Sequence, residues 1–90
     1  MLDRRNEIVS VAAKFGATNV RVFGSAARGE MAAGSDLDLL VRMNEGTSLF
    51  DLVGLSQELE DTLGVDVDVL SERGLSPYLR DRILSEAVAL

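Results

Sequence analysis

Residues 36–42 read DLDLLVR and predict a β-strand with two unlike faces. Successive side chains of a strand point to opposite faces, so the pattern divides into two sets. The apolar face holds Leu37, Leu39 and Val41. The other face holds Asp36, Asp38 and Leu40, and it therefore begins with two acids although aspartate is depleted in strands. We expect the apolar face to enter a core and the acidic face to lie outside it.

A later stretch, residues 65–70 (VDVDVL), repeats this pattern. It places three valines on one face and Asp66, Asp68 and Leu70 on the other. Taken alone, either acidic pair is more often the solvated half of an amphipathic strand than a metal site. Aspartates two positions apart nevertheless point the same way, about 6 to 7 Å apart along the strand, and carboxylates are suitable ligands for Mg²⁺. Bound Mg²⁺ would neutralise the clustered acids.

The N-terminal part of the chain predicts a helix followed by a strand. The helix covers residues 3–15, with Asp3 as its capping side chain and Gly16 as its left-handed stop. The strand covers residues 19–23 (NVRVF), which alternate and include β-branched side chains. It runs directly into a turn at Gly24.

Two further helices are predicted. Ser48 and Asp51 have the spacing of a capping box, and Gly64 supplies a stop. The second helix is therefore predicted between Ser48 and Gly64. Ser76 and Pro77 open a final helix as its cap and first residue. The apolar side chains that we expect these two helices to bury are Leu49, Leu52, Val53, Leu59, Leu63, Leu79, Ile83 and Ala87.

This order of elements predicts an α+β fold, with a small mixed β-sheet covered on one face by helices. Residues 1–90 are expected to form one domain, because a chain of this length provides one small core. The pattern leaves strand order and direction open. We expect Phe15, Phe23 and Phe50 in the core, and Tyr78 packed with its hydroxyl at the surface, with a contact to a partner as the alternative.

The composition restricts the chemistry. With no cysteine and no histidine, the chain must use carboxylates, hydroxyls, arginines and bound metal. The formal net charge of -6 disfavours direct binding to nucleic acid, because a polyanion would be repelled. No apolar run reaches the roughly 18 residues that span a bilayer, and the N-terminus lacks the apolar core of a signal peptide. A cytoplasmic protein without a membrane partner is the expectation.

A second chemical feature precedes the first acidic strand. Gly24 and Ser25 follow the strand of residues 19–23, and ten residues separate Ser25 from Asp36. Backbone N–H groups and a serine hydroxyl at a turn are suited to hold phosphate oxygens. Arg28 can add a bidentate phosphate contact. A phosphate-binding turn and a metal site would therefore lie within one window of sequence.

Together these residues resemble the GSxxRG...SDxDLxV signature of the DNA polymerase beta superfamily of nucleotidyltransferases. The matching stretches are residues 24–29 (GSAARG) and 35–41 (SDLDLLV), and residues 67–70 (VDVL) match the context of a third acid. The length is similar to that of the smallest branch, the minimal nucleotidyltransferases (MNT family), and the resemblance covers nearly the whole chain. It implies a polymerase-beta-like fold and a Mg²⁺-dependent enzyme.

The resemblance also implies roles for single residues. Asp36 and Asp38 would hold two Mg²⁺ ions, for which Mn²⁺ is a substitute, and Asp68 would complete the metal site at the reacting centre. Asp66 has no counterpart, and a solvated strand residue is the favoured interpretation of it. The implied nucleotide-binding residues, which would contact the β- and γ-phosphates of an NTP, are Gly24, Ser25 and Arg28.

The biology of this branch implies an acceptor. Such proteins are commonly encoded beside a HEPN-type toxin, a helical ribonuclease, and act as its antitoxin by transferring AMP from ATP to it. A chain of 90 residues offers little to cover a base and ribose, so a partner or a second copy is expected to close the site. The main alternative is a non-catalytic antitoxin-type module that masks its partner. An enzyme that modifies a small molecule is disfavoured, because those relatives usually carry an additional substrate domain.

Overall fold

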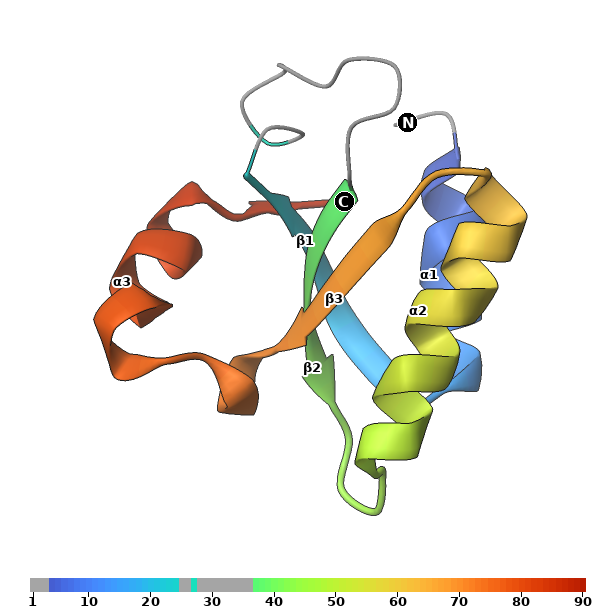
Figure 1. Ribbon diagram of the computed structural model, residues 1–90, viewed down its shortest axis with the longest axis horizontal. Coiled ribbons are helices and arrows are strands. Elements are labelled where there is room, and N and C mark those ends of the chain that lie inside the picture. Colours follow the sequence, from blue (N-terminus) through green and yellow to red (C-terminus); the bar gives the residue numbers. More distant parts are fainter. Residues whose placement is uncertain (1–3, 25–26, 28–36) are drawn as a thin grey trace.

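The structure is a computed structural model that describes residues 4–24, 27 and 37–90 (Figure 1). In chain order its elements are α1 (Arg5–Lys14), β1 (Ala17–Phe23), β2 (Leu37–Met43), α2 (Leu49–Leu63), β3 (Val67–Ser71), the 3-10 helix η2 (Glu72–Gly74), α3 (Pro77–Glu86) and β4 (Val88–Ala89). The described strands form one sheet in the order β3-β2-β1-β4. Because β2 is parallel to β3 while β1 is antiparallel to both β2 and β4, the sheet is mixed, and the predicted α+β class is confirmed.

The core lies between the sheet and two helices. Figure 1 shows α1 and α2 on one side of the sheet and α3 on the other. The predicted apolar faces of β2 and β3 enter this core, since Leu37 and Leu39 have no exposed surface and Val67 is 5% exposed. Burying each such side chain stabilises the fold by about 1.5 to 3 kcal/mol. The remaining members of the buried cluster are Ile8, Ala12, Ala17, Val20, Val22, Val41, Leu55, Leu59 and Val69.

The first turn of α1 is tied to the end of α2. Arg4 precedes α1 and donates from Nη2 both to Glu7 Oε2 and to the backbone carbonyl of Thr62, each at 2.8 Å. The predicted cap Asp3 lies outside the described residues. Gly16, with φ +75°, ends the helix region as predicted. β1 begins at Ala17, two residues before the predicted start, and an irregularity in its pairing with β2 separates the two ends of the strand.

The bounds of α2 follow its predicted caps, but its buried face is only partly as predicted. The Ser48 N–H donates to Asp51 Oδ2 at 2.8 Å, and Gly64 ends the helix with φ +72°. Leu55 and Leu59 face the core. Leu49 and Val53, which were predicted to be buried, are exposed. The apolar residues of this helix occupy more than one face, and only the face turned toward the sheet is buried.

Packing of α3 into the core was predicted and is wrong. Ser76 caps the helix by accepting the Tyr78 N–H, as expected, but α3, which is described in full, buries no side chain. Leu79 is 50% exposed, and Ala87 lies beyond the end of the helix. The physical reason is that α1 and α2 already cover the apolar face of the sheet, so α3 lies on the opposite side (Figure 1).

Three of the four predicted aromatic placements are also wrong. Phe50 is 88% exposed and Tyr78 95% exposed, and neither packs in the core. Phe23 is half-buried on the face of the sheet opposite the core, because its neighbour Val22 points inward. Phe15 packs against the core as predicted, and a Cβ at Gly54 of α2 would lie only 2.8 Å from its ring.

The last strand, β4, was not predicted from the sequence. It pairs with β1 through Arg21↔Ala89 and Val22↔Val88. Two residues are too few to produce a recognisable alternation, so only the folded chain reveals the strand. None of the described helices is both long enough and apolar enough to cross a membrane.

Candidate active site

Three neighbouring strands bring one row of side chains together on the face opposite the core. Phe23 of β1 pairs with Asp38 of β2, and Asp38 in turn pairs with Asp68 of β3. Neighbouring strands lie about 4.8 Å apart, and partners in register project to the same face. Asp38 and Asp68 are 30 positions apart in sequence (68 − 38) yet lie side by side. We call Phe23, Asp38 and Asp68 the aspartate row.

Asp38 lies against the backbone turn that follows β1. Gly24 has φ +69°, and a Cβ built on it would lie 2.5 Å from Asp38 Oδ2. Glycine is therefore required twice at this position, for the left-handed backbone and for the space that the carboxylate occupies. The structure brings the glycine of the predicted phosphate-binding turn into direct proximity with an acid of the predicted metal site.

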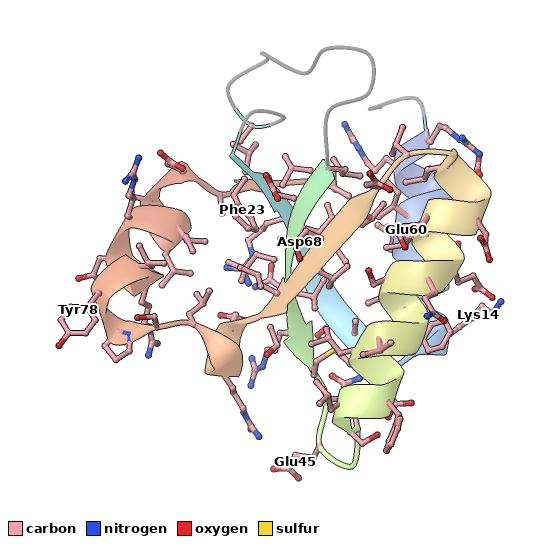
Figure 2. All side chains as sticks on the ribbon, in the orientation of Figure 1. Lys14, Phe23, Glu45, Glu60, Asp68 and Tyr78 are labelled. Atoms are coloured by element: carbon pink, nitrogen blue, oxygen red, sulfur yellow. The ribbon has the colours of Figure 1, made fainter. Side chains whose placement is uncertain are left out.

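Asp68 stands at the open end of the row. It is exposed, whereas Asp38 is half-buried between β1 and β3. In Figure 2, Asp68 projects from β3 in the centre of the view. Asp66 is also exposed and precedes the first residue of β3. Only the family resemblance favoured Asp68 over Asp66 as a site residue. Its backbone carbonyl accepts the Leu37 N–H at 2.9 Å, so its observed contribution is to strand pairing.

The neighbouring row of the same face is covered. Arg21, Leu40 and Leu70 pair across β1, β2 and β3, and Leu40 has no exposed surface. Arg21 Nη2 lies 3.1 Å from Glu72 Oε2 of η2, an ion pair by distance, although within the described part of the chain this nitrogen has no partner in hydrogen-bond geometry. Among the described residues, η2 thus pairs through Glu72 with the row of Arg21, and the aspartate row lies next to that row on the same face.

The sequence reasoning placed Leu40 on the acidic face but missed Arg21 and Phe23 of the neighbouring strand as neighbours of the acids. Alternation along residues 19–23 and 36–42 contains the necessary signal, because it places all three on the faces opposite the core. Leu40 was assigned to the acidic face, but its complete burial there was not foreseen. η2 contacts β2 in the folded chain, and no local pattern gives the position of η2.

Half of the predicted site residues lie outside the described part of the chain. These residues are Ser25, Arg28 and Asp36. Among residues 4–24, 27 and 37–90, no group of three or more potential metal ligands comes together. The three predicted site residues that the structure does describe are neighbours, because Gly24 lies against Asp38 and Asp38 pairs with Asp68.

The described acids suit a hard divalent cation. Asp38 and Asp68 offer carboxylate oxygens from adjacent strands at one end of the sheet, which is the ligand type that Mg²⁺ and Mn²⁺ take. The chain contains no cysteine or histidine that would favour a softer metal. The composition and register of the aspartate row are therefore compatible with the predicted Mg²⁺.

Comparison with known proteins identifies the family of the chain. The family model described as "Nucleotidyltransferase domain" matches residues 6–90. A protein of Methanocaldococcus jannaschii, named provisionally as a protein adenylyltransferase, is 48% identical over 84 residues, which cover 93% of this chain and 90% of the relative. Its name assigns it a protein acceptor, and the match extends over nearly the whole of both chains.

Solved structures agree with the sequence matches. One described provisionally as a minimal nucleotidyltransferase superposes with a TM-score of 0.89 at 53% identity, covering 99% of this chain and 91% of the other. A Shewanella oneidensis complex, described as a tri-AMPylated HEPN toxin with an MNT antitoxin, matches with a TM-score of 0.76 at 20% identity, covering 98% of this chain and 69% of the other. At that identity the second likeness concerns the fold alone.

Proposed function

Because the chain belongs to the nucleotidyltransferase domain family and to its minimal (MNT) branch, and is a nucleotidyltransferase, we propose that it transfers AMP from ATP to a protein hydroxyl. The observation that carries this proposal is the register of Asp38 and Asp68 on adjacent strands beside Gly24. The acceptor we propose is a HEPN-type toxin, for which this chain would be the antitoxin. The AMPylated HEPN toxin in the similar complex supports that choice.

The proposed reaction requires the acceptor hydroxyl, ATP and bound metal to meet. The acceptor oxygen attacks the α-phosphorus of ATP and forms a bond to it. The bond between the α-phosphorus and the pyrophosphate leaving group breaks. Bound Mg²⁺ would favour the deprotonated acceptor and offset the charge that develops on pyrophosphate. Asp36 and Asp38 would hold the metal, and Asp68 would complete the reacting-centre site and accept the hydroxyl proton.

Backbone geometry supports the contribution of the turn after β1. A left-handed glycine at the end of a strand leaves backbone N–H groups available to phosphate oxygens. Gly24 adopts that conformation next to the Asp38 carboxylate, so triphosphate and metal would meet at this point. Ser25 and Arg28 would contact the same phosphates through a hydroxyl and a guanidinium group.

The acceptor is the least constrained part of the proposal. Asp68 is exposed, and the pocket that includes it among the described residues is an open depression between β3 and α2. A partner protein that covers the row would exclude water and bring its own hydroxyl to the α-phosphorus. The proposal therefore expects transfer to a protein partner and little turnover without one.

A labelling experiment tests this function. Purified protein is incubated with Mg²⁺, ATP labelled in the α-phosphate and a HEPN-type protein from the same genome, in parallel with Asp38→Asn. We expect label on the partner with wild type and none with Asp38→Asn. Glu58→Gln, which removes an acid that pairs with Lys14 on the exposed surface of α2, is the matched control and should label normally.

The same experiment separates catalysis from masking. A toxin ribonuclease assay is run on each mixture after labelling. If wild type and Asp38→Asn neutralise the toxin equally and neither transfers label, the enzyme proposal fails and the chain acts as a masking module.

A further inference from the structure

The outer edge of β3 is held by two side chains of α2. β3 ends the described sheet, and β2 is its strand neighbour there. Ser56 Oγ donates to the Val67 carbonyl at 2.8 Å, and the Val67 N–H donates to Glu60 Oε2 at 3.1 Å. Figure 2 shows Glu60 projecting from α2 toward β3. We call these two contacts the Val67 clamp.

The spacing of the clamp residues on α2 explains why both side chains reach the backbone of Val67. Ser56 and Glu60 are four positions apart and therefore lie one above the other on the same face of the helix. Both contacts are partly buried, so water competes with them less than at the surface. Val67 itself is 5% exposed and anchors the beginning of β3 in the core.

The inner edge of the same segment is held by β2. The Leu37 N–H donates to the Asp66 carbonyl at 2.9 Å, and the parallel register continues through Asp38↔Asp68. The residues immediately before Asp68 are therefore fixed from both sides, by a strand on one edge and by side chains on the other. An edge strand without such contacts presents its outward N–H and C=O groups to water or to another chain.

We propose that Ser56 and Glu60 are positioning residues for AMP transfer, which set the place of Asp68 relative to Asp38 by clamping the Val67 backbone. This inference rests on the proposed function, in which both aspartates serve one metal centre. Ligand groups must be held within fractions of an ångström of productive geometry, and displacing a reacting group by about 1 Å can cost about a hundredfold in rate. The clamp acts through the backbone of the residue next to Asp68.

Three substitutions separate a hydrogen-bonding role of Glu60 from a metal-binding or charge role. Glu60→Ala removes the acceptor for the Val67 N–H, and Ser56→Ala removes the donor to the Val67 carbonyl. Glu60→Gln removes the charge but keeps a side-chain oxygen that can accept the same N–H. Glu58→Ala is the matched control on the same helix, since Glu58 pairs with Lys14 at the surface.

The first measurement is Mn²⁺ binding to the purified protein by calorimetry, without acceptor. The second is the Mn²⁺ concentration that gives half-maximal AMP transfer. We expect Ser56→Ala and Glu60→Ala to raise both the Kd for Mn²⁺ and the half-maximal Mn²⁺ concentration by about tenfold. Loss of contacts that orient metal ligands has an effect of this size. Glu60→Gln and Glu58→Ala should stay close to wild type, and the KM for the acceptor protein should change little in all four variants.

Amide hydrogen exchange provides a readout that does not depend on activity. The Val67 amide should exchange faster in Glu60→Ala than in wild type or Glu60→Gln, while amides of the β1–β2 ladder keep their protection. In an Asp68→Asn background the clamp substitutions should add no further loss of transfer, because they act through Asp68.

Distinct outcomes overturn the inference. Equal loss of Mn²⁺ affinity in Glu60→Gln and Glu60→Ala would identify Glu60 as a ligand or charge contributor and not as a clamp. Wild-type affinity in Ser56→Ala and Glu60→Ala, together with normal transfer by wild type, would refute the clamp and leave the proposed function intact. Wild type that binds Mn²⁺ but transfers no AMP refutes the proposed function, and Mn²⁺ affinity still decides on the clamp.

Discussion

β2 and β3 carry nearly the same alternation of aspartate with apolar residues, but the fold gives them different surroundings. β2 lies inside the sheet between β1 and β3, and its Asp38 is half-buried against Gly24. β3 lies at the sheet edge, and its Asp68 is exposed. One sequence pattern thus produces a confined acid and an open acid. We infer that the confined acid is suited to hold metal against phosphate, and the open one to meet an acceptor.

Removal of each acid is the strongest way to test this contrast. Asp38→Asn should lower the rate of AMP transfer by about a hundredfold or more, because several kcal/mol of metal stabilisation of the transition state are lost. Asp68→Asn should also lower it, but by a smaller factor. The measurement is initial-rate labelling of the partner at saturating ATP. A larger loss in Asp68→Asn than in Asp38→Asn would break the comparison.

Gly24→Ala tests whether the confinement of Asp38 matters. The new Cβ would collide with Asp38 Oδ2 at 2.5 Å, in addition to the strain of φ +69°. We expect a loss of about 1 to 3 kcal/mol in the free energy of unfolding and a marked loss of transfer. Chemical denaturation and labelling measure the two effects.

Gly64→Ala is the control for that substitution. Gly64 has nearly the same φ, +72°, but a Cβ there meets no described atom within 4 Å. It should cost about 1 kcal/mol from backbone strain and leave transfer near wild type. If both glycine variants lose transfer equally, proximity of Gly24 to Asp38 is not the reason.

Metal binding is expected to stabilise the fold, since the proposed Mg²⁺ would bind the native aspartate row and relieve repulsion between its acids. At ten times the Kd, a ligand specific for the native state adds about 1.4 kcal/mol, which raises the Tm of a small domain by several degrees. Asp38→Asn should lose this increase and Glu58→Gln should keep it. An unchanged wild-type Tm in millimolar Mg²⁺, with and without ATP, would contradict the proposed site.

The smallest effect is expected at the exposed ion pair between Arg4 and Glu7 at the start of α1. The hydrogen bond from Arg4 lowers the pKa of the Glu7 carboxyl below its ordinary value, so the paired, ionised form is favoured in the folded state. This contribution is present above the unfolded pKa and is lost as the pH falls through the lower folded pKa. Because the pair is exposed, Glu7→Gln should change the Tm little at pH 7, change it even less at pH 3, and leave transfer unchanged.

The main elements of the fold could be predicted because local rules fix them. Alternation identified the core faces of β2 and β3, and capping residues located the ends of α2 and the start of α3. The placement of α3 could not be predicted, since an apolar side such as Leu79 does not reveal whether a core surface is still available for it. For the same reason Phe50 was assigned to the core and is exposed.

The candidate site divides in the same way. By itself, the sequence determined which chemical groups are available: carboxylates on two predicted strands, a Gly-Ser pair after a third, and no cysteine or histidine. Composition and two-residue periodicity are local properties, so they can be read without the fold. The tertiary structure alone decided that Asp38 pairs with Asp68 and lies against Gly24, and that Ser56 and Glu60 hold the edge of β3. Strand order and register depend on the packing of α1 and α2 on one face of the sheet, which no single segment specifies.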